Sequence, residues 1–144
     1  MKRVQGFTII EIVIALMIVA IMAMMAVPSF QKWIYHLNFT GFARDVYTEF
    51  QQGRQRAIAT GIAHTVVVEP ANDSVRLLRV NDNAYVRNDV KAPKGCDIVS
   101  GTNVTFNPDG SASSNGNVRI VNLYSSVDNQ AITVTLGTGR IRFQ

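Results

Sequence analysis

The sequence predicts an α+β protein in which one long N-terminal helix packs against an antiparallel β-sheet domain. An apolar run fills residues 7–27, and a helical pattern of apolar residues resumes after Pro28 and continues to Thr60. Beyond Gly61, short β-type segments alternate with turn residues. The residues after Pro28 suffice for one small domain with its own core.

The apolar run is long enough to span a membrane, which takes about 20 residues. Thr8 and Glu11 are its only polar residues. A charged side chain inside a membrane costs on the order of 2.5–3.5 kcal/mol on insertion scales, so an intramembrane carboxylate is a functional hypothesis that calls for a partner. A Glu that snorkels near the end of an ordinary signal anchor is the alternative.

The residues before Phe7 are short and polar and include Lys2 and Arg3. They cannot hold the apolar region of about 7–15 residues that precedes cleavage in a secretory signal peptide. Any cleavage must therefore come before the apolar run. Lys2 and Arg3 favour a cytoplasmic N-terminus, which would place residues 29–144 across the membrane.

Pro28 is expected to bend the helix without ending it, because the helical pattern resumes at once. Gly61 is the expected stop, so the helix should run from Phe7 to Thr60. Trp33 and Tyr35 suit an aromatic anchor at the membrane surface, or packing against a neighbouring subunit.

The rest of the chain should form an antiparallel sheet, with turns at 71–73, 81–83, 107–110 and 137–139. The expected strands are His64–Glu69, Ser74–Val80, Ala84–Arg87, Val104–Phe106, Asn117–Leu123, Ala131–Leu136 and Arg140–Phe143.

Composition excludes several classes of site. The net charge of +4 includes Lys2 and Arg3, so bulk charge does not indicate a nucleic-acid binder. Cys96 is the only cysteine, which excludes an intrachain disulfide and favours a small buried apolar role. His36 and His64 lack neighbouring acids or cysteines, so no catalytic residue, metal site or cofactor is expected.

The N-terminus resembles that of type IV prepilins and type II secretion pseudopilins, through residues 2–6 (KRVQG) and 7–11 (FTIIE). The resemblance implies that a prepilin peptidase cleaves between Gly6 and Phe7, that Phe7 is N-methylated and that Glu11 aids assembly. In a filament, the ammonium of Phe7 in one subunit could then neutralise Glu11 of a neighbour.

Two further stretches resemble the FimT/GspH family of minor type IV pilins and minor pseudopilins. They are residues 50–61 leading into 65–68, and 106–111 followed by 132–134 and 139–142. The resemblance implies a pilin fold without enzymatic activity. The expected organisation is a leader (1–6), a transmembrane and filament-core helix (7–28) and a globular domain (29–144).

The last predicted strand places Ile141 on one face with Phe143, and Arg140 on the other with Arg142. Two residues along a strand span roughly 6.6 Å, a separation suited to neighbouring phosphates of one nucleic-acid strand. Gly139, with Gly137, is expected to form a hairpin with exposed backbone donors.

In FimT-type minor pilins, a Gly-Arg-x-Arg element similar to Gly139–Arg142 is associated with DNA binding in natural transformation. The resemblance therefore implies sequence-independent binding to phosphates through Gly139, Arg140 and Arg142. The alternative is that both arginines form the solvated face of an edge strand. Whether Arg54 and Arg56 join this surface stays open.

The first functional hypothesis is thus a DNA-binding minor pilin of a type IV pilus. A structural, GspH-like pseudopilin of type II secretion, or a pilin that primes pilus assembly without binding DNA, are the alternatives. The expected partners are other pilin or pseudopilin subunits, prepilin peptidase, the inner-membrane assembly platform and DNA. The expected location is the bacterial inner membrane with a periplasmic domain and, after assembly, a pilus or pseudopilus.

Overall fold

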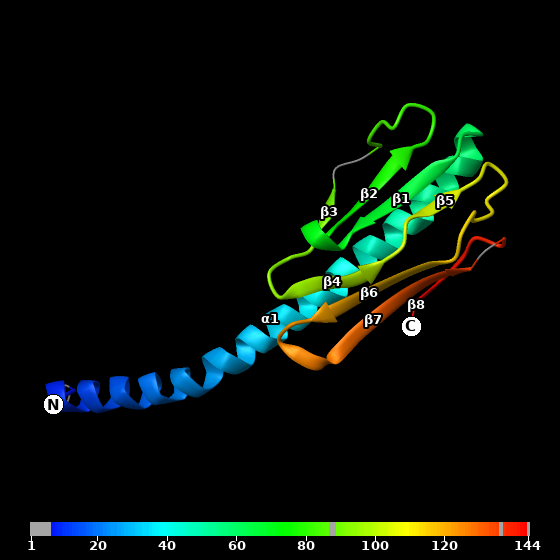
Figure 1. The fold of residues 1–144 in the computed structure, drawn as a ribbon. Coiled ribbons are helices and arrows are strands. Elements are labelled where there is room, and N and C mark those ends of the chain that lie inside the picture. The colour runs from blue at the N-terminus through cyan, green and yellow to red at the C-terminus, as the bar shows by residue number, and fades with distance from the viewer. Residues whose placement is uncertain (1–6, 87–88, 136, 144) are drawn as a thin grey trace. The chain divides into compact units, whose positions relative to one another are not determined.

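The computed structural model describes residues 7–86, 89–135 and 137–143, and it confirms the α+β class. One long helix precedes a series of antiparallel strands (Figure 1). The elements are α1 (Ile9–Thr60), β1 (His64–Glu69), the 3-10 helix η1 (Pro70–Asn72), β2 (Ser74–Arg79), β3 (Val90–Lys91), β4 (Cys96–Gly101), β5 (Val104–Phe106), β6 (Gly116–Asn122), β7 (Ser125–Thr135) and β8 (Arg140–Phe143).

Helix α1 passes through Pro28 without interruption, as the resumed periodicity predicts. It begins at Ile9, slightly later than expected, and ends just before Gly61, whose φ of +66° suits the left-handed residue that follows a helix. The chain forms two compact units, one up to Ile34 and one from Tyr35 onward, and α1 contributes to both. The bend at Pro28 stays a prediction.

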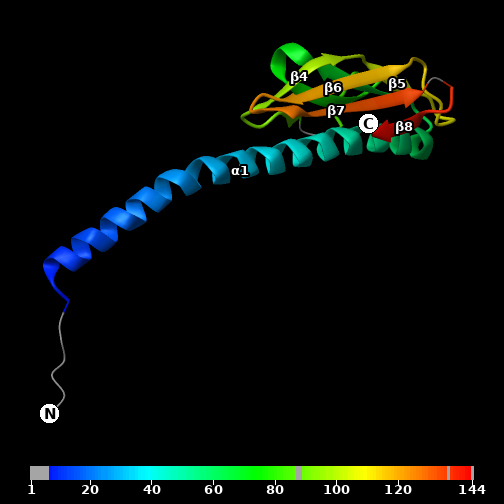
Figure 2. The same ribbon diagram turned by 90° about the horizontal axis from the view of Figure 1, so that it is seen from below.

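The strands of the second unit form two four-stranded antiparallel sheets. Their strand orders are β3-β2-β1-β5 and β4-β6-β7-β8. Both sheets lie on the same side of the C-terminal half of α1 (Figure 2). Alternation along β1 buries every second residue, so one face of the strand meets the core and the other faces outward.

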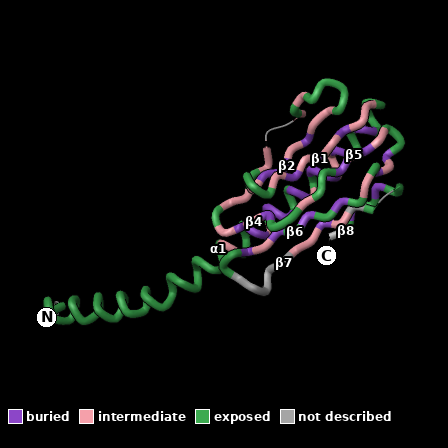
Figure 3. Tube along the Cα trace, in the orientation of Figure 1, coloured by how far each residue is buried: buried purple, intermediate pink, exposed green. Residues whose placement is uncertain are grey.

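A single apolar core joins the helix to both sheets. On α1 the buried residues begin at Phe39, whereas all residues from Phe7 to Ile34 are exposed (Figure 3). Gly53 lets the helix approach the first sheet closely, because a Cβ there would lie 3.0 Å from Val66 and 3.1 Å from Leu77. Cys96 is a buried free thiol in this core, as predicted, and burial raises its pKa.

The prediction of a strand at Ala84–Arg87 is wrong, because the described part of this segment, residues 84–86, forms no regular strand. Tyr85 makes only an isolated bridge to Leu78, and Arg87 lies outside the described residues. The regular pairing comes later, where β3 joins the edge of β2. Asp89, just before β3, forms an ion pair with Arg76 of β2 (3.3 Å), which ties the returning chain to that edge.

Two other strands differ from the sequence prediction. Strand β4 was not predicted, because Asp97, Ser100 and Gly101 hide the alternation of its buried residues Cys96 and Ile98. Strand β7 begins at Ser125, well before the expected Ala131, because its polar first half pairs with β6. The expected end of that strand, Leu136, lies outside the described residues.

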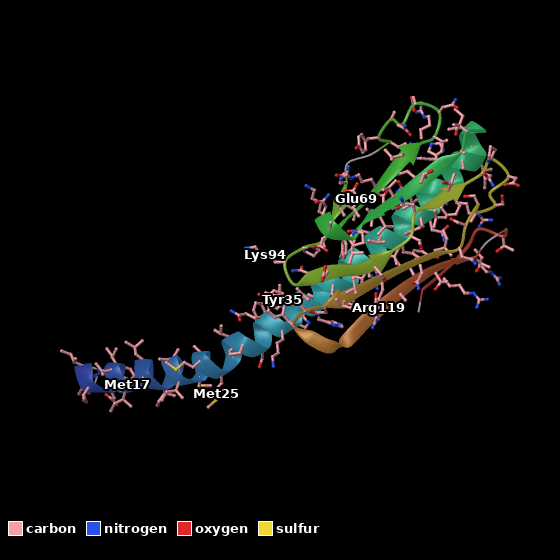
Figure 4. The ribbon with its side chains drawn as sticks, viewed as in Figure 1. Met17, Met25, Tyr35, Glu69, Lys94 and Arg119 are labelled. Atoms are coloured by element: carbon pink, nitrogen blue, oxygen red, sulfur yellow. The ribbon has the colours of Figure 1, made fainter. Side chains whose placement is uncertain are left out.

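Tyr35 of α1, labelled in Figure 4, packs against the connection between β6 and β7. Its ring stacks on the ring of Tyr124, with centroids 4.0 Å apart and an interplanar angle of 15°. A side-chain hydrogen bond with Tyr124 raises the pKa of Tyr35. Tyr35 therefore packs within its own chain, and the membrane-surface anchor suggested by the sequence stays a prediction.

Candidate functional site

The first turn of α1 carries a capping box formed by Thr8 and Glu11. The Glu11 N–H donates to Thr8 Oγ1 (3.3 Å), and the Thr8 N–H donates in return to Glu11 Oε2 (3.2 Å). The Thr8 hydroxyl donates to the same carboxylate oxygen (3.2 Å). The Glu11 carboxylate thus lies beside the start of the helix, where the helix dipole favours a negative charge.

The exposed part of α1 has the composition of a membrane span. Within the described residues, α1 is the one helix long and apolar enough to cross a membrane, with a mean hydropathy of 2.8 in its most apolar window. Met17 and Met25 are among its exposed side chains (Figure 4). Trp33, also exposed, has its ring 5.7 Å from that of Phe30.

The turn between β7 and β8 is shaped by two glycines with positive φ, Gly137 (+77°) and Gly139 (+58°). The Gly139 N–H donates to Thr135 O (3.1 Å), and the Gly137 N–H donates to Ala112 O (3.2 Å). The expectation that these glycines expose backbone donors is therefore wrong, because both N–H groups are bonded within the chain. Their main role is to form the turn and dock it.

Gly139 is buried against a second turn, which spans Asn107–Ser111. A Cβ at position 139 would lie only 2.3 Å from the carbonyl oxygen of Gly110. Asp109 stabilises that second turn by accepting hydrogen bonds from the hydroxyl (2.6 Å) and the N–H (2.8 Å) of Ser111, which lower the pKa of Asp109. The two turns thus meet in close backbone contact.

Arg54, on the last turns of α1, binds both turns. Its Nε donates to Gly110 O (3.0 Å) and its Nη2 donates to Thr138 O (3.2 Å). The turn before β8 therefore lies against the C-terminal part of α1 (Figure 2). One guanidinium connects three elements that are remote in sequence.

A hollow of about 610 Å³ opens beside this contact, and we call it the arginine hollow. Its lining residues are Arg54, Thr133, Thr135, Thr138, Arg140 and Arg142. Three arginines and three threonines thus line one space, and none of the lining residues is acidic. Such a set of donors suits a phosphate or another oxyanion.

The strand register pairs the lining residues across β7 and β8. Arg140 lies opposite Thr135, and Arg142 lies opposite Thr133. Ile141, between the two arginines, is buried, so the predicted alternation holds for these three residues. The prediction that Phe143 faces the same way as Ile141 stays a prediction, because the Phe143 side chain lies outside the described residues.

Sequence reasoning found Arg140 and Arg142 but missed the threonines and left Arg54 undecided. The structure brings Arg54 into the hollow, whereas Arg56 is exposed and is not among the lining residues. Two positions along a helix differ by about 200° in direction, which explains why the two arginines separate. Alternation from Arg140 could have found Thr133 and Thr135 once the hairpin register was known. His64, in contrast, is a buried residue at the start of β1.

Comparison with known structures identifies the fold. The minor pseudopilin EpsH from the type 2 secretion system of Vibrio cholerae has a TM-score of 0.62 and 13% identity, covering 74% of this chain and 96% of that one. The type IV minor pilin FimU of Pseudomonas aeruginosa has a TM-score of 0.63 and 12% identity, covering 76% and 90% respectively. At such identities, the likeness shows the fold alone.

Sequence comparison identifies the family. Residues 1–27 match the prokaryotic N-terminal methylation motif, which fits membrane anchoring by α1. A search of curated proteins gave no match. Residues 43–139 match the family described as type II transport protein GspH. Because this match covers more than half of the chain, the protein belongs to the GspH family of pilin and pseudopilin subunits, which are structural components of filaments and not enzymes.

Proposed function

We propose that this chain is a FimT-like minor pilin of a type IV pilus, and that the arginine hollow binds extracellular DNA during natural transformation. The observation that supports DNA binding most strongly is the lining of the hollow, with three arginines, three threonines and no acidic residue. The protein as a whole carries a modest net charge, so this binding depends on a local surface.

Two cross-strand residue pairs of the β7–β8 hairpin, which we call rungs, suggest how a nucleic-acid backbone would bind. Each rung places one arginine opposite one threonine, Arg140 opposite Thr135 and Arg142 opposite Thr133. The rungs are separated by two residues along the strand, roughly 6.6 Å. Two successive phosphates of one strand could each occupy a rung, with charge-assisted hydrogen bonds to the arginines. Contacts to phosphates carry no base information, so binding would not depend on sequence.

The N-terminal residues supply the assembly function. In this proposal, prepilin peptidase cleaves between Gly6 and Phe7, Phe7 is N-methylated, and its ammonium pairs with Glu11 of a neighbouring subunit. Lys2 and Arg3 hold the leader in the cytoplasm, so the second unit reaches the periplasm and later the filament. An intact-mass measurement of the subunit purified from its own membranes tests the cleavage site directly.

DNA binding can be tested on the mature full-length chain in a non-ionic detergent, over a salt series, with duplexes of unrelated sequence. We compare the wild type with Arg140→Gln/Arg142→Gln. The matched control is Arg44→Gln/Arg56→Gln, which also removes two charges but from exposed helix positions outside the hollow.

The wild type should bind all duplexes alike, and the hollow variant should lose affinity with a salt slope shallower by roughly 2. The control should keep the wild-type slope. Equal loss in both variants would show that net charge, and not the hollow, governs binding. Absence of wild-type binding at low salt would reject the DNA-binding proposal.

A structural pseudopilin of type II secretion is the second candidate, favoured by the family match and by the likeness to EpsH. It requires the same fold and no ligand in the arginine hollow, as does a minor pilin that only primes assembly. Genes for secretion beside the gene of this protein would favour the pseudopilin, whereas genes for competence and pilus retraction would favour the DNA-binding pilin.

A further inference from the structure

Arg54 occupies an unusual position, because it is the lining residue of the arginine hollow that comes from the helix and not from the hairpin. Its side chain is partly buried and donates to carbonyls of two separate turns, Gly110 O at 3.0 Å and Thr138 O at 3.2 Å. Thr138 comes two residues before Arg140. The guanidinium therefore holds the turn immediately before β8.

A second set of contacts ties the same turns together. The Gly137 N–H donates to Ala112 O (3.2 Å), and Gly139 leaves no room for a side chain against Gly110 O. A Cβ at Gly139 would also lie 3.3 Å from Arg54 Nε, so helix, hairpin and the Asn107–Ser111 turn meet at one point. The direction in which β8 leaves this point determines where Arg140 and Arg142 lie.

The donor geometry of arginine fits this contact and that of lysine does not. A guanidinium is a planar fork that can donate to two carbonyls in fixed directions, whereas an ammonium is a point charge on a flexible stem. Lys at position 54 would keep the charge but could not hold both carbonyls in the same geometry. The substitution Arg54→Lys can therefore separate the effect of the positive charge at position 54 from the effect of holding the two turns in place.

We propose that Arg54 is the positioning residue of the arginine hollow, which fixes the β7–β8 turn so that Arg140 and Arg142 face the same phosphates. This inference rests on the proposed DNA binding and deepens it, because the site then includes α1. The competing role for Arg54 is a third phosphate contact that acts through its charge alone.

The test compares Arg54→Lys and Arg54→Ala with Arg56→Lys and Arg56→Ala in the mature full-length chain. Arg56 is the matched control, since it lies on the same helix and is exposed outside the hollow. Three quantities are measured: DNA affinity over a salt series, the midpoint of thermal unfolding, and amide hydrogen exchange in peptides covering residues 131–144.

Arg54→Lys should weaken DNA binding roughly tenfold although every charge is retained, a loss comparable with one hydrogen bond to a charged group. Exchange in residues 131–144 should become faster, while both Arg56 variants behave as the wild type. A folded Arg54→Lys with wild-type affinity would overturn the proposal. If Arg54→Ala then lowered the salt slope by about 0.9, Arg54 would be a direct phosphate contact.

Hydrogen exchange tests the role of Arg54 independently of DNA binding. If the wild type binds no DNA, the proposed function fails, and the exchange measurement alone decides the role of Arg54. Faster exchange in Arg54→Lys with unchanged exchange in Arg56→Lys would still support positioning of the hairpin. Unchanged exchange in both would reject it.

Discussion

Two roles are proposed for Glu11, and the structure shows the atoms that take part in one of them. Within its own chain, the carboxylate accepts from the Thr8 N–H and completes a capping box. In a filament, the same carboxylate could pair with the ammonium of Phe7 from a neighbour. The first role needs only an acceptor oxygen, whereas the second needs a negative charge.

Glu11→Gln and Glu11→Ala therefore make an informative pair. Gln keeps an acceptor for the Thr8 N–H but carries no charge, so both variants should insert into the membrane and both should be missing from sheared filaments. Immunoblots of membrane and filament fractions measure the two quantities. Normal recovery of Glu11→Gln in filaments would contradict charge pairing, and loss of Glu11→Ala alone would show that assembly requires the capping acceptor.

Gly139 is a second residue whose role can be isolated, because Gly137 provides a control in the same turn. Both have positive φ, but a Cβ at Gly137 would meet nothing within 4 Å, while one at Gly139 would lie 2.3 Å from Gly110 O. Ala at either position adds left-handed strain of about 1–2 kcal/mol. Gly139→Ala should cost at least about 1 kcal/mol more, measured by thermal unfolding. Equal costs would mean that the turns do not meet in the observed way.

At the residue scale, the sequence singled out both hairpin arginines, which line the hollow, but it could not place Arg54. Cleavage between Gly6 and Phe7 stays a prediction. The two partners of Arg54 are 56 and 84 positions away in the chain. Helical periodicity tells which face of α1 is apolar, and it does not tell which loop meets a polar residue at the margin of that face. The buried site of Gly139 was hidden for the same reason.

At the scale of elements, the sequence predicted best where alternation and turn residues agree. Strands β1, β5 and β8 have the predicted bounds, and α1 ends at the predicted residue. Strand β4 and the first half of β7 could not be predicted, because polar residues hide the alternation in β4 and dominate the first half of β7. Both segments are held as strands by pairing with β6. Division into two sheets likewise depends on long-range pairing that no local pattern reveals.

One contact between elements is expected to depend on pH. Asp73, at the end of η1, accepts from the Ile98 N–H of β4 (3.0 Å), and the neighbouring Asp97 has a raised pKa, mainly because its side chain hydrogen-bonds to that of Asp73. The folded protein therefore holds this proton more tightly than the unfolded chain. Its stabilising effect is present at acidic pH and is lost as the pH rises through the raised pKa of Asp97.

Asp97→Asn should remove this dependence, because Asn can donate to Asp73 without titrating. We expect the variant to be more stable than the wild type at neutral pH and the difference to shrink toward about pH 4. Thermal unfolding at both pH values provides the measurement, with Asp45→Asn, an exposed helix position, as the control. A difference that does not change with pH would show that the two carboxyls do not share a proton.

At the scale of the whole molecule, α1 serves both units of the chain. Its first half is exposed and apolar, and its second half carries the buried residues from Phe39 onward. Family membership assigns this architecture to pilin and pseudopilin subunits, which assemble with other subunits after processing. Whether the second unit binds DNA is what distinguishes a DNA-binding minor pilin from a structural pseudopilin or a priming pilin.

The most direct test of DNA binding in its proposed setting is capture of labelled DNA by isolated filaments that contain this subunit. Filaments carrying the wild type are compared with filaments carrying Arg140→Gln/Arg142→Gln or Arg44→Gln/Arg56→Gln, after immunoblots confirm equal incorporation. The account predicts that only the Arg140→Gln/Arg142→Gln filaments lose DNA, and that added salt abolishes the capture by the others. Equal capture by all three kinds of filament would contradict it and leave the chain as a structural subunit.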